Sequence, residues 1–213
     1  MAGKISLDIR EQIEKGVSLL KQGRIIAYPT DTVYGLGACV EFPEAIERIY
    51  AVKERPRNMS FPLLVSDESQ IVKLAGNLSP LTRMLIRKYL PGALTLVLPA
   101  SSSVPEIITG HGKTVAIRIP DHPVPLALIR GLGAPIVGTS ANLSGHPSAL
   151  NAEQVYDQLG DKVDFIIDGG QCPGGKESTI VDVTGAKPVI LREGAIPSTE
   201  LETEIQKFMQ EVV

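Results

Sequence analysis

Apolar residues near the start of the chain recur with helical spacing and are then replaced by a short run of branched residues. The apolar positions from Ile9 to Leu20 are spaced by four, four and three residues, which predicts a helix over residues 7–22. Gly23 follows as a stop signal. Residues 24–28 contain the pair Ile25 and Ile26 and predict a short strand.

Segments with helical spacing of apolar residues continue to alternate with short strand-like apolar runs along the chain. This pattern predicts further helices over residues 43–53, 81–90, 123–129, 152–159 and 198–209, with another helix starting near Ser66. It predicts strands over residues 34–40, 61–65, 93–98, 114–119, 135–138, 163–167, 178–183 and 188–191. Because the last two strands form a hairpin-like pair, we expect one α/β domain over residues 1–213, built on a twisted mixed sheet rather than a purely parallel one.

Composition narrows the classes of function. Hydrophobic residues make up 43% of the 213 positions and charged residues 21%, as in ordinary globular proteins. Aromatic residues are only 4%, with no Trp, which disfavours an aromatic platform for stacked bases. A net charge of -3 and a pI near 5.7 argue against wholesale binding to nucleic acid or anionic membrane, but they allow a local basic cleft.

Two cysteines and the absence of a long apolar run bear on the compartment. Cys39 and Cys172 are too few for a disulfide framework or a zinc cage. No signal peptide is recognisable, and no apolar run reaches the length of a membrane span. We therefore expect a reduced, cytoplasmic protein with no membrane partner.

The stretch from Tyr28 to Gly37 is a candidate ligand loop. Pro29 fixes its own φ and favours extended backbone before it, Asp31 can accept hydrogen bonds from turn amides, and the glycines allow close backbone approach. In α/β proteins ligands bind beyond the carboxyl ends of strands, where these hydroxyls and this carboxylate would lie. The alternative is a polar hairpin loop with no ligand.

Scattered cations form a second candidate feature. Three cations lie close together at a predicted helix end: Lys53, Arg55 and Arg57. They either face solvent and interact favourably with the negative end of the helix dipole, or they bind an anion between them. Arg118 and Arg192 each end an apolar strand, as edge charges or as groups aimed into a cleft.

A loop over residues 140–145, Ser-Ala-Asn-Leu-Ser-Gly, supplies hydroxyl, amide and glycine groups after a short apolar strand. It is either a turn with a helix cap or a phosphate-binding loop. The glycine-rich residues 168–176 lack the spacing of a P-loop, and no dinucleotide-binding fingerprint follows a strand. His111, His122 and His146 are expected in exposed loops, and no nucleophile, base and orienter set is recognisable.

Seven short motifs, taken in order, resemble the YrdC-like family of threonylcarbamoyl-AMP synthases. They occupy residues 29–37, 53–56, 91–95, 116–120, 140–145, 177–179 and 191–194, and the match extends from about residue 23 to residue 196. The resemblance implies a concave basic cleft that condenses L-threonine, bicarbonate and ATP into threonylcarbamoyl-adenylate and pyrophosphate, with helices packed around it. Partner proteins would then transfer the threonylcarbamoyl group to tRNA.

The resemblance also assigns site residues. Thr32, Arg118 and Ser178 would bind threonine, with Arg118 on its carboxylate. The implied nucleotide-binding residues are Lys53, Arg55, Met59, Ser140, Asn142, Ser148 and Arg192, of which Lys53, Arg55, Ser140 and Asn142 would be catalytic. The mechanism that the resemblance implies also includes a Mg²⁺ carried by the nucleotide, although no acidic metal cage is visible in the sequence.

Two departures from the family pattern stand out, and two other functions remain open. Met59 replaces a residue that is commonly polar, and the chain stops near where longer relatives add a linker and a second domain. One alternative is a non-catalytic RNA-binding or ribosome-associated module with a basic concave surface. The other is a carbamoyl-adenylate enzyme that uses carbamoyl phosphate.

Overall fold

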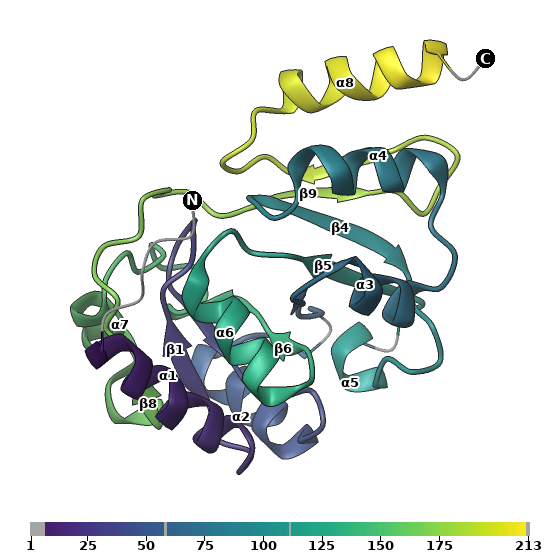
Figure 1. Ribbon diagram of the computed structural model, residues 1–213. Coiled ribbons are helices and arrows are strands. Elements are labelled where there is room, and N and C mark those ends of the chain that lie inside the picture. The colour runs from purple at the N-terminus through teal and green to yellow at the C-terminus, as the bar shows by residue number, and fades with distance from the viewer. Residues whose placement is uncertain (1–6, 58, 111, 212–213) are drawn as a thin grey trace.

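The computed structural model describes residues 7–57, 59–110 and 112–211, and within them the strands form two hydrogen-bonded sheets (Figure 1). The first has the order β7 (Thr139–Ser140), β2 (Gly35–Gly37), β1 (Ile26–Tyr28) and β8 (Phe165–Ile166). The second has the order β10 (Val189–Arg192), β9 (Thr179–Asp182), β4 (Leu94–Pro99), β5 (Thr114–Arg118), β3 (Leu63–Leu64) and β6 (Ile136–Val137).

Both sheets are mixed, which confirms the predicted α/β class. In the first sheet β1 is antiparallel to β2 and parallel to β8. In the second, parallel pairs (β3 with β5, β4 with β9) alternate with antiparallel ones (β3 with β6, β4 with β5, β9 with β10). The predicted hairpin near the end is the β9–β10 pair.

The division into two sheets was not foreseen, and Gly138 explains it. Gly138 joins β6 of the second sheet directly to β7 of the first. A Cβ atom at this residue would lie 2.3 Å from the Leu64 side chain, so only glycine allows the chain to cross there. The two sheets therefore meet at this crossing, where the site described below lies.

Helices cover both sheets. They are α1 (Leu7–Leu20), α2 (Pro43–Lys53), α3 (Glu68–Ala75), α4 (Pro80–Tyr89), α5 (Glu106–Thr109), α6 (Pro123–Leu132), α7 (Ala152–Leu159) and α8 (Ser198–Glu211), with a 3₁₀ turn at Gly160–Lys162. The predicted helices are all present within a few residues. Short α5 was not predicted, because four residues carry no helical periodicity.

Side-chain caps fix several helix starts. Asp67, Ser79 and Asn151 each accept a hydrogen bond from the amide three residues later, at 3.1, 3.1 and 2.9 Å. Each cap satisfies a donor that the helix cannot, a contribution of about 1 kcal/mol. The predicted helix start near Ser66 is thus confirmed, and the helix predicted over residues 81–90 begins after its cap, Ser79.

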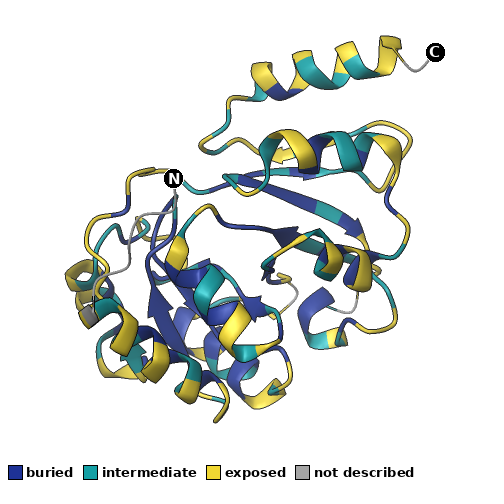
Figure 2. Ribbon diagram, viewed as in Figure 1, coloured by how far each residue is buried: buried dark blue, intermediate teal, exposed yellow. Residues whose placement is uncertain are grey.

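Buried side chains form two clusters, one under α1 and α6 and a larger one shared by the remaining helices and both sheets. Figure 2 shows that most of the central strands β1, β4 and β5 is buried. Leu20 and Leu128 are fully buried in the first cluster, as the apolar spacing of their helices requires. Each such side chain contributes about 1.5–3 kcal/mol. Helix α8 lies against α4 and buries only Leu201 completely. No helix in the described ranges is both long and apolar enough to cross a membrane.

Candidate functional site

A cavity of about 350 Å³ opens where the two sheets meet. It is lined by the loop after β1, the segment after α2, and residues of β3, β4, β5, β7, β9 and β10. Seven of the predicted site residues line it: Thr32, Arg55, Met59, Arg118, Ser140, Ser178 and Arg192. Residues far apart in sequence are thus brought to one hollow of the size of a small-molecule site.

Thr30 organises the loop after β1. Its hydroxyl accepts hydrogen bonds from the amides of Thr32 (3.1 Å) and Val33 (3.2 Å) and donates to the Val33 carbonyl (2.6 Å). It also lies 3.0 Å from the Thr32 hydroxyl. Because these groups are buried, the satisfied turn holds the Thr32 hydroxyl in one position in the cavity.

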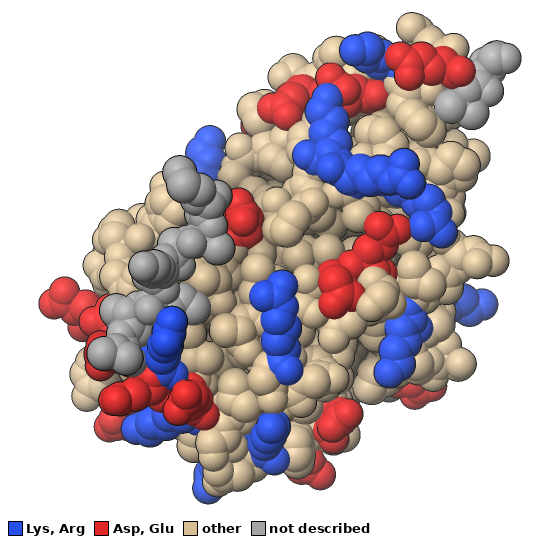
Figure 3. All heavy atoms as spheres, viewed as in Figure 1, with Lys and Arg blue, Asp and Glu red and all other residues tan. Residues whose placement is uncertain are grey.

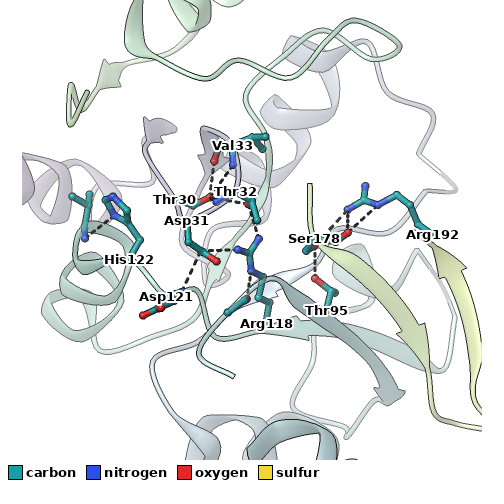
Figure 4. A network of polar contacts seen from close by, with 12 residues as sticks. Thr30, Asp31, Thr32, Val33, Thr95, Arg118, Asp121, His122, Ser178 and Arg192 are labelled. Carbon is teal, nitrogen blue, oxygen red and sulfur yellow. Dashed lines mark hydrogen bonds and ion pairs between the residues drawn. The ribbon is translucent and has the colours of Figure 1, made fainter. Parts of the chain in front are cut away.

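Arg118, the last residue of β5, faces this loop (Figure 4). Its Nε donates to the Gly92 carbonyl (2.8 Å), Nη1 to Thr32 Oγ1 (2.9 Å) and Nη2 to Asp31 Oδ1 (2.6 Å). The Asp31 carboxylate also accepts from the Asp121 amide (3.1 Å). A guanidinium carries five N–H groups, so one on each terminal nitrogen is left for a ligand carboxylate.

A second polar group lies on the strands opposite. Ser178, just before β9, has its hydroxyl 2.7 Å from that of Thr95 on β4. Arg192, at the end of β10, donates to the Ser178 carbonyl from Nη2 (2.8 Å) and Nε (3.2 Å). A register shift between Ile190 and Arg192 accompanies this placement of the arginine.

Arg55 reaches the cavity because α2 ends in a left-handed turn. Glu54 has φ of 53°, and the Arg55 amide bonds to the Tyr50 carbonyl (3.0 Å). The Arg55 guanidinium donates to the Ser60 carbonyl (3.1 Å) and lies over the Phe61 ring at 5.2 Å. Burial lowers its pKa, and the charge of Arg192, which lines the same cavity, lowers it further.

Lys53 lies behind the cavity wall rather than in it. Its side chain is buried and donates to the carbonyls of Ser140 (2.5 Å) and Asn142 (2.7 Å) and to Asn142 Oδ1 (3.2 Å). Burial lowers its pKa to about 7, the Arg55 charge adds to this, and Glu177 opposes it. Lys53 therefore holds the loop over residues 140–142, and both interpretations of it from sequence, a solvent-facing charge and a clamp open to anions, misplace its side chain.

Asn142 and Ser148 also stand away from the cavity wall. The Asn142 amide donates to the carbonyls of His146 (2.6 Å) and Leu143 (3.0 Å), and this closes the loop. Ser148 donates to Glu177 Oε1 (2.6 Å). Glu177 itself lines the cavity, and sequence analysis assigned it no role although it begins one of the seven motifs.

Other predicted features have ordinary explanations. Arg57 is exposed and pairs with Glu47, as the solvent-facing interpretation expects. His146 is exposed as predicted, and His111 lies outside the described residues. His122, expected in an exposed loop, is instead half-buried as the cap of α6, where its Nδ1 accepts from the Val124 amide (3.2 Å). Burial lowers its pKa.

A larger groove of about 590 Å³ lies elsewhere, between α4 and α8, and is lined in part by Arg83, Arg87 and Lys88. Figure 3 shows a band of positive side chains over the region of α4. Arg83 pairs with Glu68, and Lys88 pairs with Glu204. None of the predicted site residues lies in this groove, so its size does not make it the candidate site.

Comparison with known proteins agrees with the motif pattern. Residues 18–194 match the family model Sua5_yciO_yrdC, described as "Telomere recombination". The chain belongs to this Sua5/YciO/YrdC family. The resemblance read from the seven motifs, which placed the match at about residues 23–196, is therefore confirmed.

Relatives in the Sua5/YciO/YrdC family include the threonylcarbamoyl-AMP synthase of Pyrococcus abyssi, 40% identical over 94% of this chain and 61% of the relative. The enzyme of that name from Bacillus subtilis is 41% identical over 91% of this chain and 56% of its own length. The crystal structure of P. abyssi Sua5 complexed with L-threonine has a TM-score of 0.89 and 38% identity, over 95% of this chain and 59% of that one. The chain thus spans about three fifths of the length of these relatives.

Proposed function

We propose that this chain condenses L-threonine, bicarbonate and ATP into threonylcarbamoyl-AMP with release of pyrophosphate. The observation that carries the proposal is the convergence of Arg55, Arg118 and Arg192, from three separate elements, on one cavity that also presents the Thr32 and Ser178 hydroxyls. All three substrates bring negative charge, so fixed cations and donors are what the reaction needs most. The names of the relatives and the threonine complex support the same chemistry.

In this mechanism the threonine amine forms a bond to the carbon of bicarbonate or of the CO₂ derived from it, with loss of water. An oxygen of the resulting carbamate attacks the α-phosphorus of ATP, and pyrophosphate leaves. Arg118 would hold the threonine carboxylate through its two remaining N–H groups, beside Thr32. Arg55, Arg192 and Ser140 would face the phosphates, and Ser178 would close the amino-acid side.

Lys53, Asn142 and Ser148 would act on the nucleotide less directly. Lys53 and Asn142 support the loop that presents Ser140, and Ser148 contacts Glu177 in the cavity wall. Met59 is exposed at the rim, where its apolar side chain could contact only an apolar part of the nucleotide. Among the described residues no three His, Cys, Asp or Glu side chains gather to hold a metal, so Mg²⁺ would enter on the phosphates and neutralise part of their charge.

The product is a mixed anhydride, an activated donor of the threonylcarbamoyl group. We propose that partner proteins pass this group to tRNA, in the cytoplasm. The test is an omission series: pure protein is incubated with ATP, threonine and bicarbonate, and pyrophosphate is measured. Release only when all three are present supports the proposal. Release without threonine would refute it, and release with carbamoyl phosphate in place of threonine and bicarbonate would favour the carbamoyl-adenylate alternative.

A further inference from the structure

The nucleotide side of the cavity contains a carboxylate where an anionic ligand is expected. Glu177 is the one acidic side chain among the described residues that line the cavity. Its Oε1 accepts a hydrogen bond from Ser148 (2.6 Å), and its Oε2 lies 3.4 Å from Arg192 Nη1. A carboxylate so placed would repel an incoming triphosphate, and this calls for an explanation.

We propose that Glu177 is an internal counter-anion that occupies part of the phosphate subsite in the empty protein and is displaced by the nucleotide. The inference rests on the proposed function. It makes Glu177 a residue that sets nucleotide affinity, with Arg192 as the cation that it shares with the ligand and Ser148 as the group that holds its carboxylate in place.

Arg55 and Arg192 both line this cavity, so two positive charges face the same hollow. Arg192 lowers the pKa of Arg55, and Arg55 lowers that of Lys53. Glu177 acts in the opposite direction on Lys53 and raises its pKa. The Glu177 carboxylate in the same cavity wall offsets part of this repulsion until a phosphate replaces it.

The contacts around Glu177 also allow it to leave. Its backbone is fixed, since its carbonyl accepts from the Ala195 amide (2.8 Å), so the carboxylate can move by side-chain rotation alone. The side chain is 37% exposed and has solvent to move into. Arg192 stays in place when Glu177 leaves, because two of its nitrogens remain bound to the Ser178 carbonyl at 2.8 and 3.2 Å.

Displacement would therefore free Arg192 Nη1 for the ligand, while the rest of the site keeps its geometry. A phosphate oxygen can take the place of the carboxylate beside this nitrogen and accept a hydrogen bond from it. The cost of displacement is that of an exposed ion pair and one hydrogen bond, which limits the effect on affinity to about one order of magnitude.

The test measures binding rather than turnover. Calorimetric titration with ATP in EDTA, without threonine or bicarbonate, compares the unaltered protein with Glu177→Gln. We expect about three- to tenfold tighter binding in the variant, because the competing charge is gone while its size is kept. Glu68→Gln is the matched control: it removes a carboxylate that also pairs with an arginine, Arg83 at 2.9 Å, but lies outside the cavity, and it should leave ATP affinity unchanged.

A second variant, Glu177→Asp, separates the effect of the charge from that of the side-chain length. Glu177→Asp keeps the charge but shortens the side chain, so it cannot span both Ser148 and Arg192, and binding should tighten less than in Glu177→Gln. Equal or weaker ATP binding by a folded Glu177→Gln protein overturns the inference, as does a loss of affinity seen only with Mg²⁺, which would make Glu177 a metal ligand. Absence of ATP binding in every variant would overturn the proposed function as well.

Discussion

Replacing Arg118 with alanine should damage threonine binding and stability by separable amounts. The guanidinium is almost fully buried, with 7% of the side chain exposed, and it pairs with Asp31, whose side chain is 15% exposed. Removing one member of such a pair leaves the other charge without its partner, at a cost of about 3–5 kcal/mol of unfolding free energy. For a domain of this size the melting temperature should fall by about 10 °C.

The loss in binding has a different origin. If Arg118 holds the threonine carboxylate in a desolvated site, its removal should cost about 2–5 kcal/mol of binding. At 1.4 kcal/mol for each factor of ten, the threonine KM should rise by about 30-fold to a few thousand-fold. The ATP KM should change little, because Arg118 lies beside Asp31 and Thr32 and apart from Arg192 (Figure 4).

A double variant separates the two effects. Asp31→Asn in the Arg118→Ala background removes the unpaired carboxylate, so most of the lost stability should return. Threonine binding should stay weak, because the guanidinium group of Arg118 that would bind the threonine carboxylate is still absent. Pyrophosphate release with each substrate titrated in turn, together with thermal melts, measures both quantities. Equal rises in both KM values, or recovery of threonine affinity with stability, would refute this reasoning.

Three further variants extend the argument. Arg55→Ala should raise the ATP KM far more than the threonine KM, the mirror image of Arg118→Ala in the same assay. Burial lowers the pKa of Lys53 to about 7, so between about pH 7 and 10 the unfolded chain binds more protons than the folded one. The free energy of unfolding should therefore rise with pH over this range. In Lys53→Met, chemical denaturation at several pH values should show a smaller rise. Gly174→Ala would place a Cβ 2.9 Å from Thr32 Cα, so the threonine KM should rise, whereas Gly185→Ala, with no atom closer than 3.6 Å, should have no effect on it.

The helices were predictable because their signals are local. Apolar spacing, caps such as Ser79 and stops such as Gly23 all act within a few residues. Most strands lie where they were predicted, but several are shorter: residues 34–40 contain one three-residue strand, Gly35–Gly37, and an isolated bridge at Cys39. Strand β7 was not predicted, because its residue Ser140 was assigned to a loop. Pairing depends on which partner strand lies alongside, and one sequence segment does not specify its partner.

The placement of Lys53 and the role of Glu177 depend on contacts with residues distant in the sequence. Lys53 sits in the last helical turn, where a cation ordinarily faces solvent, yet acceptors from residues 140–142 surround it. Nothing in the sequence around Glu177 indicates that its carboxylate accepts a hydrogen bond from Ser148, 29 positions earlier. The arginines were easier to assign to the site from the sequence. A charge that interrupts an apolar strand, as Arg118 does, is rarely buried unless it has a partner.

The glycine-rich residues 168–176 show the same limit. They were recognised as failing the P-loop spacing, but their role came only from the structure. Tyr34 Oη donates to the Gly170 carbonyl (3.0 Å) and accepts from the Gly169 amide (3.2 Å), and the Gly175 amide donates to the Thr32 carbonyl (3.1 Å). The glycines allow this segment to pack directly on the loop that presents Thr32.

The most direct test of the account follows both new bonds in one product. The protein is supplied with threonine, ¹⁴C-labelled bicarbonate and ATP labelled with ³²P at the α-phosphate, and the nucleotides are separated. The account predicts a single species that carries both labels in equal amounts and forms only when threonine is present. Formation of labelled AMP and pyrophosphate without ¹⁴C in any nucleotide would contradict it.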